Sequence, residues 1–205
     1  MQNQNDISAI IIDKENRGEA SIMLTAFSAE EGLVFLFKRM SAKKTSIVPD
    51  LFDEIVCQTK PPESSKNTPI HFLQNFDVLK HRTGIATSYE KLCVSAEIAK
   101  IIKINGENID EKQSLFNLLT KTFDAIESTQ NLKAVQIKFL YLLTKEQGYA
   151  IKEDFFQSLS SDDKTTFTYI LKNPAQNLHD YIQQAENIYI KLKRWIQTNT
   201  DIIVE

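Results

Sequence analysis

One stretch of the chain concentrates basic side chains. Residues 32–49 contain no acidic residue but include Lys38, Arg39, Lys43 and Lys44, in a chain whose net charge is −3. The four residues leave an apolar run and enter a loop that also carries serine and threonine hydroxyls. Such groups on a loop can bind phosphates without reading bases. A solvated loop that only keeps the protein soluble explains the same pattern about equally well.

Other residues bear on this basic run. Arg17, together with Lys14, Lys80 and Arg82, extends it if the turns that carry these residues lie on the same side of the protein. Exposed aromatic side chains on a small barrel can stack on the bases of a single strand. The nearest aromatic residues are Phe35 and Phe37, which alternate with apolar neighbours, and we expect both of them to lie in the core.

Residue patterns typical of catalysis are absent from the sequence. It contains no glycine-rich phosphate loop, no Gly-x-Ser-x-Gly, no Cys-x-x-Cys and no His-Glu-x-x-His. The three histidines lack a partner at metal-ligand spacing, although His71 and His81 lie close enough in the sequence to leave a shared site open. Cys57 and Cys93 suit two reduced, buried thiols. We expect no enzyme activity, no metal and no cofactor.

Composition gives the broad class of the protein. The chain has 205 residues, of which 42% are hydrophobic and 25% are charged, an ordinary balance for one large or two small globular domains. No apolar run is long enough to span a bilayer. The first residues lack the basic and apolar regions of a signal peptide, so we expect a cytoplasmic protein.

The first eighty residues have the pattern of strands. Five short apolar runs are separated by turn residues and predict a small closed barrel. Gly18 and Gly32 lie where a turn needs a positive φ. The runs are apolar on both faces, so we expect one outer face of the barrel to pack against the second half of the chain. The predicted strands are residues 9–13, 21–27, 33–38, 52–59 and 70–78, with a polar loop at residues 60–67.

From about Thr87 the apolar period becomes helical. Thr87 and Glu90 have the spacing of a capping box. We interpret the apolar stripes as core positions of a bundle. The sequence therefore predicts an α+β multidomain fold, with a barrel over residues 1–80 and an all-α domain over residues 81–205. The first stripe is Tyr89, Leu92, Cys93, Ala96, Ala99 and Ile102, and further helices are expected from about Asp110, over residues 132–148, 153–159 and 162–171, and from Leu178 to Ile196.

Several segments resemble the family of the bacterial recombination mediator RecO. Residues 18–34, GEASIMLTAFSAEEGLV, are similar to the family's Glu-x-Ser, apolar strand and Thr/Ser-x-Glu-x-Gly-Leu. Lys43-Lys44-Thr45-Ser46 is similar to its basic loop ending in Lys-Ser. The second half offers similar segments in the same order: Tyr89-Glu90-Lys91-Leu92, Leu115-Phe116-Asn117-Leu118-Leu119, and Ile137 to Leu143 followed by Gly148-Tyr149.

The resemblance implies a five-stranded oligonucleotide-binding (OB-type) barrel joined to a helical bundle. It also implies binding to single- and double-stranded DNA, strand annealing, and loading of a recombinase together with a RecR-like protein and single-stranded-DNA-binding protein, at the nucleoid. No catalysis is implied. The expected DNA contacts, carried over onto this sequence, are Lys38, Arg39, Lys43 and Lys44, with Arg17 next.

The chain also departs from this family. Many relatives carry a four-cysteine zinc site after the Gly-Tyr pair, whereas no cysteine follows Cys93 here, so zinc is not expected. Family members are commonly longer and more basic. The alternative is a protein-interaction module on the same scaffold, with weak or no DNA binding.

Overall fold

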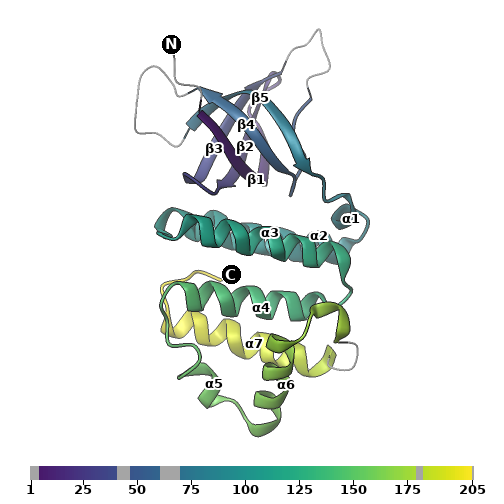
Figure 1. The fold of residues 1–205 in the computed structure, drawn as a ribbon, viewed down its shortest axis with the longest axis vertical. Coiled ribbons are helices and arrows are strands. Elements are labelled where there is room, and N and C mark those ends of the chain that lie inside the picture. The colour runs from purple at the N-terminus through teal and green to yellow at the C-terminus, as the bar shows by residue number, and fades with distance from the viewer. Residues whose placement is uncertain (1–4, 41–46, 61–69, 179–181, 205) are drawn as a thin grey trace. The chain divides into compact units, whose positions relative to one another are not determined.

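The structure, a computed structural model, describes residues 5–40, 47–60, 70–178 and 182–204. It confirms the predicted fold class, because a closed five-stranded barrel precedes a series of helices (Figure 1). The chain divides into two compact units. The first comprises Met1–Arg82 and Ile102–Thr120, and the second comprises Thr83–Ile101 and Lys121–Glu205. The barrel unit therefore includes a helical segment from beyond the boundary predicted at residue 80.

Each of the five predicted runs forms a strand. Around the barrel the order is β1-β2-β3-β5-β4, and β4 pairs with β1 to close it. All neighbours are antiparallel except β3 and β5, which are parallel. This is the OB-type arrangement. The strands are β1 (Asn5–Asn16), β2 (Ser21–Ser28), β3 (Gly32–Arg39), β4 (Glu54–Lys60) and β5 (Ile70–Lys80).

The inward-facing side chains, which are every second residue of a strand, fill the barrel interior. Successive side chains of a strand point to opposite faces, and on β3 the inward positions are Val34 and Leu36, both fully buried. β-branched and small residues dominate the inner positions, which suits the narrow interior of a five-stranded barrel. The core cluster consists of Ile7, Ala9, Ile11, Ile22, Leu24, Ala26, Val34, Leu36, Ile55, Cys57 and Leu73.

One outer face of the barrel is covered within the same unit. Ile10 and Phe27 pair across β1 and β2, and both are fully buried. The short 3₁₀ turn η1 (Gly106–Asn108) follows α2 and contacts the barrel. A Cβ at Gly106 would lie 3.3 Å from the ring of Phe27, so glycine allows the close approach. The expectation that the second half covers part of the barrel holds for this segment.

The predicted glycine turns are present. Gly18 has φ +71° in the turn between β1 and β2, which the bond from Arg17 N to Ser21 O (2.9 Å) closes. Gly32 has φ +81° at the start of β3. Both positions therefore use a backbone conformation that glycine adopts without steric cost.

A buried arginine secures the strand ends. Arg82 donates to Phe52 O at 2.8 Å and to Glu54 Oε2 at 3.0 Å, and its side chain is fully buried. Phe52 is a non-glycine residue with φ +68°, a conformation that costs energy. The bond from Arg82 holds its carbonyl in place. Arg82 therefore does not extend a surface basic patch, and Lys14 pairs with Asp50 at 3.6 Å.

The helical unit is built around two packed helices. α4 and α7 lie against each other, and α6 packs against both. A group of aromatic rings, with Phe155 and Phe167 fully buried, fills the space beside them. The described helices are α1 (Thr83–Ala86), α2 (Tyr89–Asn105), α3 (Lys112–Ser128), α4 (Leu132–Glu146), α5 (Phe155–Ser158), α6 (Ser161–Lys172), η2 (Ala175–Asn177) and α7 (Ile182–Asn199). None of them is long and apolar enough to cross a membrane.

The first helical stripe was predicted wrongly over its first half. Tyr89 is 81% exposed, and Leu92, Cys93 and Ala96 are also exposed, whereas Ala99 is buried. The buried face instead begins at Lys91, whose ammonium donates to Glu127 O at 2.6 Å. A lysine that can bury its stem and satisfy its charge at the end of a helix competes with apolar residues for the inner face.

The predicted capping box is also displaced by one residue. Ser88 Oγ accepts from Lys91 N at 3.4 Å, while Thr87 Oγ1 donates to Gly84 O at 2.8 Å. Ser88, not Thr87, therefore caps α2. Gly148, with φ +82°, follows α4 as predicted.

A polar network crosses the helical unit. Glu97 of α2 accepts hydrogen bonds from Gln136 of α4 and from Tyr189 and Lys193 of α7, the last at 3.0 Å. Burial, followed by the bond to Glu97, raises the pKa of Tyr189. The carboxylate thus has three donors, as a largely buried charge requires.

The ion pair between α6 and α7 predicts a pH-dependent contribution to stability. Lys191 donates to Asp163 at 2.6 Å, and this bond holds the pKa of the Asp163 carboxyl below its ordinary value of 3.8. A lowered folded-state pKa stabilises the fold above the unfolded pKa, and the gain is lost as pH falls through the folded pKa. Asp163→Asn, which resembles the protonated carboxyl, should reduce the free energy of unfolding by about 1–2 kcal/mol at pH 7.

Urea unfolding at pH values from 7 to 3 measures this difference. The difference in the free energy of unfolding between wild type and Asp163→Asn should become smaller at the lowest pH values. Asp162→Asn, at the exposed neighbouring position of the same helix turn, is the control. A gap that stays constant with pH would contradict the role given to Lys191.

Candidate nucleic-acid interface

The outer face of β2, β3 and the start of β5 carries a continuous apolar surface. Residues paired directly across neighbouring strands point to the same face. The register places Met23 opposite Phe37 and Phe37 opposite Phe72, and in the next row it places Phe35 opposite Ile70. None of the five belongs to the barrel core cluster. We call these five residues the aromatic strip.

The aromatic strip is open to solvent. Phe72 is 40% exposed and Ile70 is 38% exposed, and Phe35 and Phe37 are partly exposed. The rings of Phe37 and Phe72 meet edge to face, with centroids 5.7 Å apart. The prediction that Phe35 and Phe37 lie in the core is therefore wrong. Their strand neighbours fill the interior, so alternation directs both rings outward.

Basic residues lie at the edges of the strip. Arg39 ends β3 two residues after Phe37, so it shares the outer face, and it is exposed. Lys60 pairs with Phe72 at the other edge. Arg17 lies in the turn after β1, but its guanidinium is 2.8 Å from Glu15, which offsets part of its charge.

The structure separates Lys38 from Arg39. Lys38 pairs with Ile22, a core residue, so it points to the inner side of the barrel wall. Its ammonium lies 5.0 Å from the centroid of the Phe76 ring, a cation–π contact. Burial lowers the pKa of Lys38. The two basic residues predicted as neighbouring DNA contacts therefore lie on opposite faces of β3. Lys43 and Lys44 fall outside the described residues.

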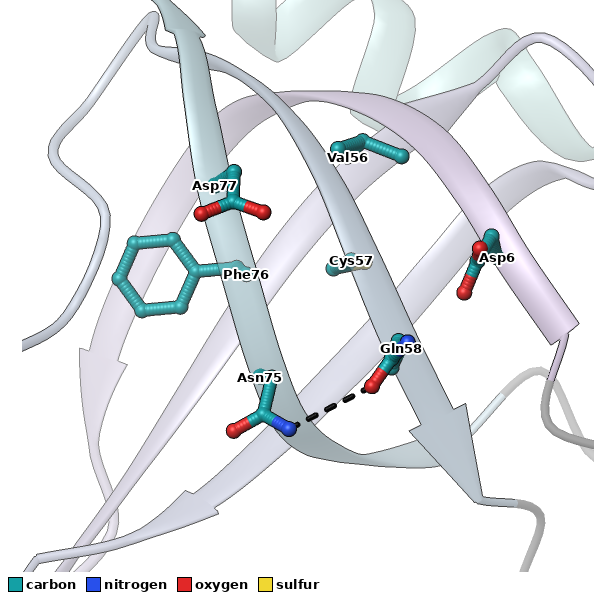
Figure 2. Close-up of a pocket in the computed structure, with 7 residues that line it drawn as sticks. All are labelled: Asp6, Val56, Cys57, Gln58, Asn75, Phe76 and Asp77. Atoms are coloured by element: carbon teal, nitrogen blue, oxygen red, sulfur yellow. Dashed lines mark hydrogen bonds between the residues drawn. The ribbon is translucent and has the colours of Figure 1, made fainter.

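A second surface of the barrel carries acidic side chains in place of basic ones. A concavity of about 280 Å³ lies over β4, β5 and the start of β1 (Figure 2). The carboxylates of Asp6 and Asp77 flank it, and in its lining Asn75 donates to Gln58 at 3.4 Å. Acidic groups repel phosphates. A nucleic-acid strand is therefore disfavoured on this face.

The histidines His71 and His81 do not share a carboxylate partner. His71 contacts Glu31 and His81 contacts Asp53, each at 3.0 Å, so the two rings have separate partners. Asp53 and its neighbour Glu54 likewise have different partners, His81 and Arg82. Across the described parts of the chain, no three His, Cys, Asp or Glu side chains form a group that could hold a metal ion.

The two cysteines differ in environment. Cys57 belongs to the barrel core, and burial, with smaller effects from nearby carboxylates, raises the pKa of its thiol to about 12. Cys93 is exposed on α2, so the prediction of two buried thiols is confirmed only for Cys57. At neutral pH Cys57 is a protonated core side chain and not a nucleophile.

Comparison with known proteins adds no assignment. No protein-family model matches this chain, and no curated protein sequence matches it.

The sequence carries a signal for the aromatic strip. The run from Leu33 to Lys38 alternates two phenylalanines with Val34 and Leu36. Only one of the two sets can face a narrow interior. The pairing partner Phe72 could not be identified from the sequence, because the parallel contact between β3 and β5 joins residues far apart in the chain.

The cysteine environments predict selective modification. A disulfide reagent such as 5,5′-dithiobis(2-nitrobenzoic acid) should modify Cys93 within minutes at pH 8, while Cys57 stays protected until the barrel unfolds, because the thiolate is the reactive form. Peptide mass spectrometry assigns the modified residue, and Cys93→Ser isolates the reaction of Cys57. Equal modification rates for the two thiols under native conditions would contradict the barrel register.

Proposed function

We propose that the barrel binds single-stranded nucleic acid on the aromatic strip, in a RecO-like role as an accessory protein of DNA repair and recombination. The observation that carries the proposal is the exposure of three phenylalanines on the outer face of β3 and β5, with Arg39 on the same face. Aromatic surfaces beside cationic groups are the usual combination in proteins that bind single strands.

The chemistry of the strip favours single strands over duplexes. Bases of a single strand are free to lie against an aromatic ring, whereas those of a duplex must first unpair. Stacking is worth about 1–3 kcal/mol per base and tolerates any sequence. Duplex binding would depend on phosphate contacts, and the described residues supply few exposed cations near the strip. We therefore propose that single strands bind more tightly than duplexes.

The position of the strip within the fold supports the same proposal. Barrels of the OB type bind oligonucleotides across the face of their second and third strands, flanked by the β1–β2 and β4–β5 loops. Here three of the five residues of the strip lie on β2 and β3, Arg17 begins the first of these loops, and Lys60 precedes the second. Lys43 and Lys44 follow β3 in the sequence and lie outside the described residues, and in this proposal they supply further phosphate contacts.

The wider role follows from the family resemblance. A protein that holds single strands by stacking and phosphate contacts could bring complementary strands together, and it could exchange single-stranded-DNA-binding protein for a recombinase with a RecR-like partner. These steps need no catalytic residue. The helical unit would provide the surfaces for protein partners, and the complex would act at the nucleoid.

A protein-interaction module is the second candidate. The acidic concavity in Figure 2 and the net charge of −3 favour partners other than nucleic acid. In that case the aromatic strip would bind an apolar peptide. Recovery of a protein partner after nuclease treatment, with no affinity for oligonucleotides at about 50 mM salt where electrostatic binding still shows, would favour this candidate.

The stacking proposal predicts which substitutions weaken binding. Phe37→Ala and Phe72→Ala should each raise the Kd for a labelled single strand about 5- to 150-fold, the equivalent of about 1–3 kcal/mol. Fluorescence anisotropy measures the Kd. Tyr89→Ala removes an aromatic ring that is more exposed than either phenylalanine, from the helical unit, and should leave the Kd unchanged. Unchanged affinity in both phenylalanine variants would rule out the strip as the binding surface.

The contributions of charge and of stacking to single-strand binding can be separated, because only the contribution of charge depends on salt. Replacing Arg39 with alanine should reduce the slope of log Kd against log salt by about 0.7, the value for one phosphate contact to a single strand. The phenylalanine variants should keep the wild-type slope, because stacking releases no counterions. Asp77→Asn, in the acidic concavity, is the control and should not weaken binding. A wild-type slope in the Arg39 variant would mean that Arg39 contacts no phosphate.

A further inference from the structure

The relative orientation of two rings limits how a strand can lie on the aromatic strip. Phe37 of β3 and Phe72 of β5 are paired across the parallel contact, and both rings are partly open to solvent. Their centroids are 5.7 Å apart and their planes meet at 86°, so that the edge of one ring is turned toward the face of the other. The strip therefore offers two aromatic planes that are almost perpendicular.

The neighbours of the two rings favour this arrangement. The register places Met23 beside Phe37 on one side and Lys60 beside Phe72 on the other, so the two rings lie within one row of four paired residues. Aromatic pairs prefer edge-to-face contact to a face-to-face sandwich. A rearrangement that made the two rings parallel would give up the contact between them.

Two successive bases cannot lie on these rings and stay stacked on each other. A base that stacks on a ring lies parallel to it, so bases on Phe37 and Phe72 would themselves be nearly perpendicular. Stacked neighbours also follow one another at about 3.4 Å along a strand, which is less than the 5.7 Å between the two ring centroids. Both the angle and the spacing require the two bases to leave their mutual stack.

We propose that the strip binds two successive nucleotides in an unstacked arrangement, and that it therefore prefers thymine-rich single strands to adenine-rich ones. This inference rests on the proposed function and specifies the substrate of the same site. Either base can stack on a phenylalanine ring, but adenines in a single strand stack on each other more strongly than thymines do. An adenine-rich strand thus gives up more stacking when it binds, and preferences of this origin are modest in size.

Strands that carry only two bases test the proposal. Each is about ten nucleotides long, within the range of OB-type sites, and is abasic except for two adjacent positions in the middle. These positions hold two thymines, two adenines or two 2-aminopurines, and a fully abasic strand is the reference. All four strands have the same phosphates, so differences in affinity arise from the bases alone.

The affinities should follow the cost of unstacking. Fluorescence anisotropy with the full chain should give a Kd for the two-adenine strand about 3- to 10-fold higher than for the two-thymine strand, and the fully abasic strand should bind more weakly than both. Phe72→Leu keeps an apolar side chain but removes one aromatic plane, so the preference for thymine should disappear. Tyr89→Ala, in the helical unit, is the control and should keep it.

The strand with two 2-aminopurines reports the arrangement of the bases directly. This base absorbs at longer wavelengths than protein, and an adjacent pair gives an exciton couplet in circular dichroism only while the two bases are stacked. At saturating protein the couplet should vanish with wild type and with Tyr89→Ala. It should persist with Phe72→Leu and with Phe37→Leu, because a single ring leaves the second base free to stack on the first.

The possible failures are distinguishable. A couplet that persists in the wild-type complex, or that vanishes equally in the leucine variants, would overturn this inference and leave the proposed function standing. Equal affinities for the two-thymine and two-adenine strands would also overturn the inference alone. If the fully abasic strand binds wild type as tightly as the two-base strands, or if no strand binds, stacking on the strip fails and the inference fails with it.

Discussion

The parallel pairing of β3 with β5 is the constraint on which the barrel and its candidate interface both depend. It joins β3 to β5 within the closed sheet, and it fixes which side chains meet on each face. With Val34 and Leu36 inside, alternation directs Phe35 and Phe37 outward, and the register with β5 adds Ile70 and Phe72 beside them. A five-stranded barrel has no interior room for three further rings. Closure of the fold thus produces an exposed aromatic surface.

Charge is distributed over the barrel in a way that suits a ligand held mainly by stacking. Arg39 shares the outer face with the aromatic strip, whereas Lys38 turns inward to Phe76. The concavity bounded by Asp6 and Asp77 lies over other strands and disfavours phosphate there. Among the described residues of the barrel, few cations are therefore placed to bind a duplex by its backbone alone. In this account base stacking provides most of the affinity, and the basic groups set the path of the strand.

The sequence was sufficient for the fold class and the strand positions, because alternation and turn glycines are local signals. It was insufficient where burial depends on partners distant in the chain. Apolar character alone predicts a core position for Phe35 and Phe37, and only the closed sheet distinguishes the inward-facing from the outward-facing residues of β3. Tyr89 and Leu92 were assigned to a buried stripe because a buried lysine at position 91, satisfied at the end of α3, could not be foreseen. Sequence proximity predicts one shared surface for Lys38 and Arg39, but neighbouring residues of a strand point to opposite faces.

Photochemical crosslinking of a single-stranded oligonucleotide carrying 5-bromouracil tests the central claim most directly. The base forms covalent adducts with aromatic side chains that it stacks on, and peptide mass spectrometry identifies the attachment site. The account predicts adducts on the peptides that contain Phe35, Phe37 and Phe72, and loss of the corresponding adduct when each is replaced by leucine. Adducts confined to the helical unit, or to the face that carries Asp6 and Asp77, would contradict it.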